Sequence, residues 1–88
     1  MKRFAVLTHS LSMARIWLEV DHKARMTHVD KGIFPSGDHF QIFYRVERLR
    51  GTGTFDDYME GPPVPITPKQ LLELREMRQI IECQVERK

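Results

Sequence analysis

The sequence predicts one small α/β domain, built from a single sheet of three to four strands and two helices in the order strand, helix, strands, helix. Three segments carry this prediction: an apolar run at residues 3–8, an alternating segment at residues 40–46 and a capped amphipathic stretch at residues 67–85. At 88 residues the chain has the length of one domain, so we expect residues 1–88 to fold as one unit. An α+β arrangement is the alternative.

The N-terminal segment, residues 3–8, is apolar enough for a buried strand. Basic residues, Lys2 and Arg3, stand at its start, as they would in a signal peptide. The apolar run ends at Thr8, however, which is too short for a secretory hydrophobic region. We therefore expect a strand here.

Residues 11–23 are predicted to form a helix, with Ser10 as its N-cap. At about 100° per residue, one side of this helix is apolar and a second apolar row lies beside it. The first side carries Leu11, Ala14 and Leu18, and the row beside it carries Met13, Trp17 and Val20. A strand is the alternative, because apolar and polar residues alternate over residues 14–20. The helix is preferred because its pattern begins upstream of that alternation, at Leu11 and Met13.

Glycine, proline and apolar alternation divide the middle of the chain into short elements. Residues 25–29 predict a short strand, and residues 31–38 carry the residues typical of a loop. The cleanest strand pattern follows at residues 40–46. After it we expect a turn at residues 50–53 and a further strand at residues 54–59.

The C-terminal helix has the strongest start signal in the chain. Prolines within residues 62–65 predict an extended connector before it. Thr67 and Gln70 then form a capping box, with Pro68 at the first helical position. One apolar face follows at helical spacing: Leu71, Leu74, Met77, Ile81 and Val85. Three residues fall off that face and are predicted to form an interaction surface: Leu72, Ile80 and Cys83.

The composition is that of an ordinary globular protein, with 41% hydrophobic and 30% charged residues, which excludes a disordered chain. The single cysteine, Cys83, excludes an internal disulfide and fits a reducing compartment, so we expect a cytoplasmic protein. No apolar stretch reaches the length of a transmembrane helix, and we expect no membrane partner.

No residue pattern predicts a metal ion, a cofactor or a catalytic centre. The four histidines, His9, His22, His28 and His39, lack the paired spacing of a structural zinc site. A phosphate loop of the form G-x-x-x-x-G-K-[ST] is absent from the sequence. Ser10 directly follows His9, and sequence neighbours do not normally present nucleophile and base, so Ser10 is interpreted as a helix cap. The enzymatic alternative places His9, Ser10 and Asp56 around a phosphorylated ligand.

Arginine outnumbers lysine nine to five, and arginine favours bidentate contacts with phosphate or carboxylate. Arg45, Arg48 and Arg50 form a basic cluster near an aromatic residue, which is the best nucleic-acid signal in the chain. Together with Lys2 and Arg3 they are the candidate contacts for nucleic acid or another anion. The alternative is a surface ion-pair network with the neighbouring acidic residues Glu47, Asp56 and Asp57.

The order of three short stretches resembles a cut-down ATPase core of the kind found in phage terminase motors and helicase-like proteins. These stretches are Thr8-His9-Ser10 after a strand, Ala14-Arg15-x-Trp17 in a helix, and Arg48-Leu49-Arg50-Gly51 leading into a strand. Small phage-encoded and prophage-encoded proteins look similar over residues 3–60. Because the phosphate loop is missing, the resemblance implies a fold and a viral origin rather than nucleotide hydrolysis.

The function expected from these observations is that of a small non-enzymatic interaction protein. It would bind a protein partner or associate with itself, through Leu72, Ile80 and Cys83. The alternative is a nucleic-acid-binding accessory protein that uses the basic cluster of Arg45, Arg48 and Arg50.

Overall fold

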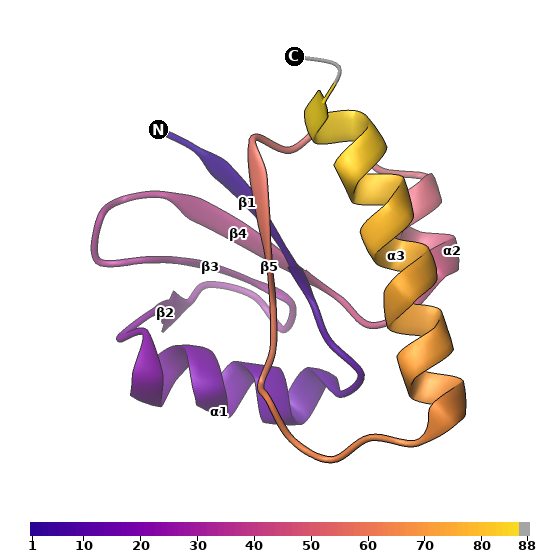
Figure 1. The fold of residues 1–88 in the computed structure, drawn as a ribbon. Helices are drawn as coiled ribbons and strands as arrows, with labels where there is room; N and C mark the ends of the chain where they lie inside the picture. Colours follow the sequence, from indigo (N-terminus) through magenta and orange to yellow (C-terminus); the bar gives the residue numbers. More distant parts are fainter. Residues whose placement is uncertain (87–88) are drawn as a thin grey trace.

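The computed structural model describes residues 1–86, and this part of the chain contains five strands and three helices (Figure 1). In chain order they are β1 (Arg3–Leu7), α1 (Leu11–Asp21), β2 (Arg25–Met26), β3 (Lys31–Ile33), β4 (His39–Phe43), α2 (Val46–Arg50), β5 (Asp57–Glu60) and α3 (Pro68–Glu86). The predicted class, a small domain that mixes helices with one sheet, is confirmed. The predicted three to four strands and two helices were too few.

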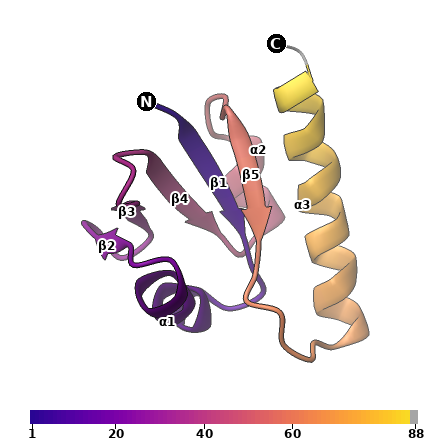
Figure 2. The ribbon, with the colours of Figure 1, turned by 60° about the vertical axis from the view of Figure 1, so that its left-hand side comes forward.

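The strands form a single sheet in the order β2-β3-β4-β1-β5 (Figure 2). β1 lies between β4 and β5 and runs parallel to both. β3 and β2 continue the sheet beyond β4 in antiparallel pairing. The carboxyl ends of β1, β4 and β5 therefore meet at one edge of the sheet, and their amino ends meet at the opposite edge.

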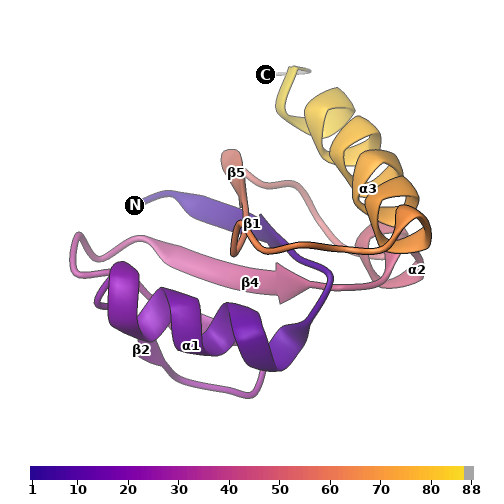
Figure 3. The ribbon, with the colours of Figure 1, turned by 60° about the horizontal axis from the view of Figure 1, so that its bottom comes forward.

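Helices lie on both faces of the sheet (Figure 3). α1 covers one face over the buried residues Val6, Ala14, Leu18, Ala24, Phe40 and Ile42. α2 and α3 cover part of the other face over Ala5, Leu7, Phe43, Val46, Leu49, Phe55, Leu74, Met77 and Ile81. Because strand side chains alternate between faces, β1 contributes Val6 to the first core and its neighbours Ala5 and Leu7 to the second.

α1 begins directly after Ser10, whose Oγ accepts a hydrogen bond from the amide of Met13 at 3.4 Å. The predicted helix is confirmed, although it ends two residues earlier than expected, and the alternative strand is wrong. A strand would have placed Ala14, Ile16 and Leu18 on one face. In the helix Ala14 and Leu18 are buried against the sheet, whereas Ile16 points away from it and is 65% exposed.

β4 ends earlier than predicted, because the chain turns into a helix that the sequence pattern did not reveal. Ile42 and Phe43 are adjacent and both buried, since helices cover both faces of the sheet at this point. Val46, expected as the last strand residue, instead begins α2 and is buried together with Leu49. A helix of five residues is too short for its periodicity to be distinguished from a continuing strand.

β3 lies where a loop was predicted, and it supplies the unexpected strand. Gly32 suggested a turn, but in the structure it is buried at the centre of β3. A Cβ atom at Gly32 would overlap the ring of Phe40 and lie 2.5 Å from the carbonyl oxygen of Arg25. Glycine is therefore required here by close packing. The turn itself follows at Gly37, where φ is 92°.

α3 begins with the capping box that the sequence predicted. The amide of Thr67 donates to Gln70 Oε1 at 3.0 Å, and the amide of Gln70 donates to Thr67 Oγ1 at 3.2 Å. The inner face of the helix buries Leu74, Met77 and Ile81. The predicted apolar face is thus confirmed at its centre, whereas Leu71 in the first turn is 47% exposed.

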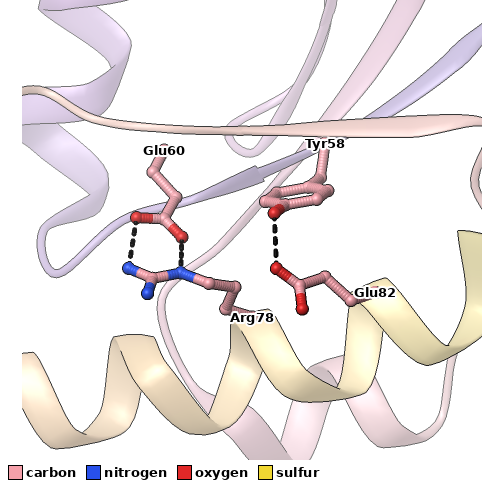
Figure 4. Close-up of polar contacts among 4 residues, drawn as sticks. All are labelled: Tyr58, Glu60, Arg78 and Glu82. Atoms are coloured by element: carbon pink, nitrogen blue, oxygen red, sulfur yellow. Dashed lines mark hydrogen bonds and ion pairs between the residues drawn. The ribbon is translucent and has the colours of Figure 1, made fainter.

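Two polar contacts connect the edge strand β5 to α3 (Figure 4). The hydroxyl of Tyr58 donates to Glu82 Oε1 at 2.7 Å, and the resulting hydrogen bond to a carboxylate raises the pKa of Tyr58. Arg78 forms a bidentate ion pair with Glu60, in which Nη2 lies 2.9 Å from Oε2. The hydrogen bond and the negative charge of Glu60 raise the pKa of Arg78. These contacts fix α3 along β5.

Candidate interaction surface

The residues of the enzymatic alternative lie at opposite edges of the sheet. His9 and Ser10 follow the carboxyl end of β1, where Ser10 caps α1. Asp56 lies at the amino end, and its Oδ2 accepts from the amide of Arg3 at 2.8 Å. Within residues 1–86, no group of three His, Cys, Asp or Glu side chains is arranged to hold a metal ion.

The predicted surface on α3 is only partly exposed. Leu72 is 54% exposed and Cys83 is exposed, but Ile80 is half-buried and packs against the core under α2 and α3. Ile80 and Cys83 line an open hollow of about 550 Å³ together with Arg50 of α2. Leu72 does not line this hollow, so the three residues do not form one continuous apolar patch.

The predicted basic contacts are distributed over several surfaces. Lys2 and Arg3 stand at the amino end of β1, whereas Arg45 follows the carboxyl end of the parallel strand β4. The two edges are separated by the length of a five-residue strand, whose four steps span about 13 Å. Arg48 and Arg50 are two residues apart on α2, so their side chains leave the helix on opposite sides. The structure does not bring the five residues together.

A row of apolar residues lies on the outer side of α1, and three of them are exposed. We call its four residues the α1 seam: Met13, Ile16, Trp17 and Val20. Their spacing of i, i+3, i+4 and i+7 places them in one row. The exposed fractions are 40% for Met13, 65% for Ile16 and 57% for Val20, while Trp17 is half-buried. α1 therefore has two apolar sides, one against the sheet and one facing outward.

The connector after β5 turns the α1 seam into one wall of a groove. Pro62 and Val64 form the other wall, and the groove has a volume of about 290 Å³. Gly61 allows this arrangement, because a Cβ atom there would lie 2.5 Å from the ring of Trp17. The ring of Trp17 also contacts His22, whose ring packs edge-on at a centroid distance of 4.6 Å.

The acidic residues of α1 lie near its C-terminus. Its first turn contains no acidic residue and its last turn no basic residue. Glu19 and Asp21 lie near the C-terminus, where they do not complement the helix dipole. Asp21 also lines the groove. Arg15 is occupied elsewhere, since its guanidinium donates to the carbonyl of Val29 at 2.9 Å.

The sequence interpretation missed this surface because it placed Met13, Trp17 and Val20 next to the buried side of the helix. The row formed by these three residues with Ile16 was the signal that could have identified it. With Ala14 and Leu18 already supplying a complete inner face, a second row at helical spacing indicates a helix with two contact sides.

Within the described chain, none of the helices is both long enough and apolar enough to cross a bilayer. The resemblance to a motor ATPase core, with the viral origin it implies, stays a prediction. We compared the chain with protein-family models, curated proteins and solved structures, and none of them matches it.

Proposed function

We propose that this chain is a small non-enzymatic interaction protein that associates with a second copy of itself through the α1 seam. The observation that carries the proposal is the outward row of Met13, Ile16 and Val20 beside a groove. Single exposed apolar residues are ordinary on protein surfaces, whereas a continuous apolar patch is typical of a contact site.

The spacing of the seam suits two antiparallel copies of α1. In such a pairing Met13 of one copy lies opposite Val20 of the other, and Ile16 lies opposite Trp17. The same patch serves both copies, so the contact closes as a two-fold dimer. α1 has 11 residues and is about 16 Å long, so the seam extends over most of its length.

The charges on α1 favour this antiparallel direction. A helix N-terminus carries a partial positive charge, and that of α1 has no acidic side chain in its first turn. In an antiparallel pair, Glu19 and Asp21 of one copy lie beside the N-terminal turn of the other, near Ser12. A parallel pair would instead bring the carboxylates of both copies together.

The size of the contact predicts a weak dimer. One 11-residue helix with two connector residues offers less than the roughly 800 Å² per partner that is typical of stable complexes. We therefore expect dimers that dissociate as the protein is diluted through the micromolar range.

Sedimentation velocity from about 5 µM to about 500 µM tests the proposal, since this range covers dissociation constants typical of weak dimers. The monomer mass is 10.4 kDa, and we expect it to rise toward twice that value with concentration. Ile16→Glu should keep the protein monomeric, because it places a charge in the centre of the seam. Leu72→Glu is the matched control: an apolar residue of similar exposure on another helix.

Two results would overturn the proposal. One is a wild-type protein that stays monomeric over the whole range. The other is loss of the dimer in Leu72→Glu but not in Ile16→Glu, which would move the contact to α3. Circular dichroism of both variants checks that they are folded, and Val20→Glu provides a second substitution in the seam.

A further inference from the structure

A second candidate site lies on the other side of the sheet from α1. There a cavity of about 360 Å³ opens over β3, β4 and the start of β1. α2 and α3 stand over β1, β5 and the end of β4, and leave this part of the face uncovered (Figure 3). The principal polar side chains that line the cavity are Arg3, Thr27, His28, Lys31, His39 and Gln41.

The register of the sheet explains why these side chains are neighbours. Arg3 pairs with His39, which pairs in turn with Ile33, so one row crosses three strands. The next row on the same face contains Gln41 and Lys31. Adjacent strands are about 4.8 Å apart, so the two rows form one compact polar surface. The part of a sheet face that lies beneath a helix is normally apolar. This part has no helix over it, and its side chains are mainly polar and basic.

The charge of the cavity is not neutralised by its own lining, which contains no Asp or Glu among the described residues. Within residues 1–86 the side chain of Lys31 forms no hydrogen bond or ion pair, and neither does that of His39. Two acidic residues near the rim accept hydrogen bonds from backbone amides. Asp38 accepts from the amide of Lys2 at 2.9 Å, a hydrogen bond that lowers the pKa of its carboxyl group. Asp56 accepts from the amide of Arg3.

Arg3 is held at the mouth of the cavity and still offers donors. Its guanidinium lies 5.0 Å from the ring centroid of Phe55, and Nη1 donates to the carbonyl of Thr54 at 3.2 Å. An arginine side chain has five N–H donors, and the bond to Thr54 uses one of them. Phe55 itself is buried beneath Arg3 and presents no face for a base to stack on.

We propose that this cavity binds a phosphate group, presented by a free phosphate ester or by the backbone of a single-stranded nucleic acid. Arginine, lysine and imidazole donors converging on one cavity match an anion with several acceptor oxygens. The volume falls in the range of small-ligand sites. The phenylalanine rings that line the cavity, Phe4, Phe40 and Phe55, are half-buried or buried, so the exposed lining suits the phosphate better than a stacked base.

This site differs from the basic cluster expected from the sequence. It retains Arg3, but it replaces the three arginines around α2 with residues from β3, β4 and the turn between β2 and β3. It is also independent of the α1 seam, which lies on the opposite face of the sheet. Ile16→Glu should therefore leave phosphate binding unchanged.

Binding is tested with two probes at low salt: pyrophosphate, by isothermal titration calorimetry, and a fluorescein-labelled 12-mer of deoxythymidine, by fluorescence anisotropy. Lys31→Glu is the test variant and Arg45→Glu is its control, because both reverse one exposed charge and only Lys31 lines the cavity. We expect Lys31→Glu to weaken binding by at least about tenfold, as loss of a charge-assisted contact does, and Arg45→Glu to weaken it by no more than about threefold.

The two probes distinguish the sources of the phosphate. Binding of pyrophosphate alone assigns the site to a free phosphate ester. Binding of the 12-mer, with a log–log salt slope of about −0.7 for each phosphate contacted, assigns it to a nucleic-acid backbone. If neither probe binds, or if the two variants lose affinity equally, the cavity is not a phosphate site.

Discussion

Replacing Gly61 with alanine should destabilise the protein by forcing the connector away from α1. The added Cβ would lie 2.5 Å from Cη2 and 2.6 Å from Cζ2 of Trp17, whereas carbon atoms in contact are normally about 3.5–4.0 Å apart. The ring also packs edge-on against His22, so a shift of the indole would disturb that contact. Either the connector or the indole must move by roughly 1 Å, and overpacking of this kind costs about 1–3 kcal/mol.

Urea denaturation followed by circular dichroism measures this loss. In a thermal denaturation experiment on a domain of this size, a loss of 1 kcal/mol in the free energy of unfolding corresponds to a decrease in Tm of about 4–8 °C. Gly51→Ala is the matched control, because a Cβ atom there meets nothing within 4 Å and the backbone φ of −96° suits alanine. We expect the control to change stability by less than about 0.5 kcal/mol. Equal denaturation midpoints for the two variants would refute the contact between Gly61 and Trp17.

Two further predictions concern the sheet and its edge. Gly32→Ala should destabilise the protein by about 3 kcal/mol or more, because the added Cβ would meet the ring of Phe40 and the carbonyl oxygen of Arg25. That carbonyl group cannot move without breaking the sheet. A urea denaturation curve that matches wild type would contradict this prediction. Tyr58→Phe should cost about 1 kcal/mol at neutral pH through the lost hydrogen bond to Glu82. Since folding raises the pKa of Tyr58, this contribution is present below the unfolded value near 10 and is lost as pH rises through the folded value. The stability difference between wild type and Tyr58→Phe should therefore shrink above about pH 10, and a difference that stays constant to pH 11 would contradict the assignment.

Features that depend on a few neighbouring residues were predictable from the sequence. Ser10 and the pair of Thr67 and Gln70 marked the starts of α1 and α3, because capping bonds join groups at most three residues apart. The inner face of α3 was predictable for a similar reason, since helical periodicity extends over 19 residues there. Its length makes that pattern unambiguous.

Short elements with long-range partners were not predictable. α2 contains five residues and β3 contains three, so neither is long enough to repeat its pattern twice. β3 exists because it pairs with β2 and β4, and Gly32 is compatible with a strand only because Phe40 fills the space beside it. The burial of Phe43, at the end of β4, could not be predicted from alternation either, because helices cover both faces of the sheet there.

The sequence by itself determined a small α/β domain, the caps of α1 and α3 and the apolar inner faces of these two helices, because these follow from local hydrogen bonds and periodic burial. Only the tertiary structure decided which surfaces remain for binding. Met13 and Val20 face outward because Ala14 and Leu18 already fill the space above the sheet. Arg3 and Lys31 share a cavity because strand register brings together residues that are 28 positions apart in the sequence. No local pattern contains that information, since it depends on how strands pair and where the helices end.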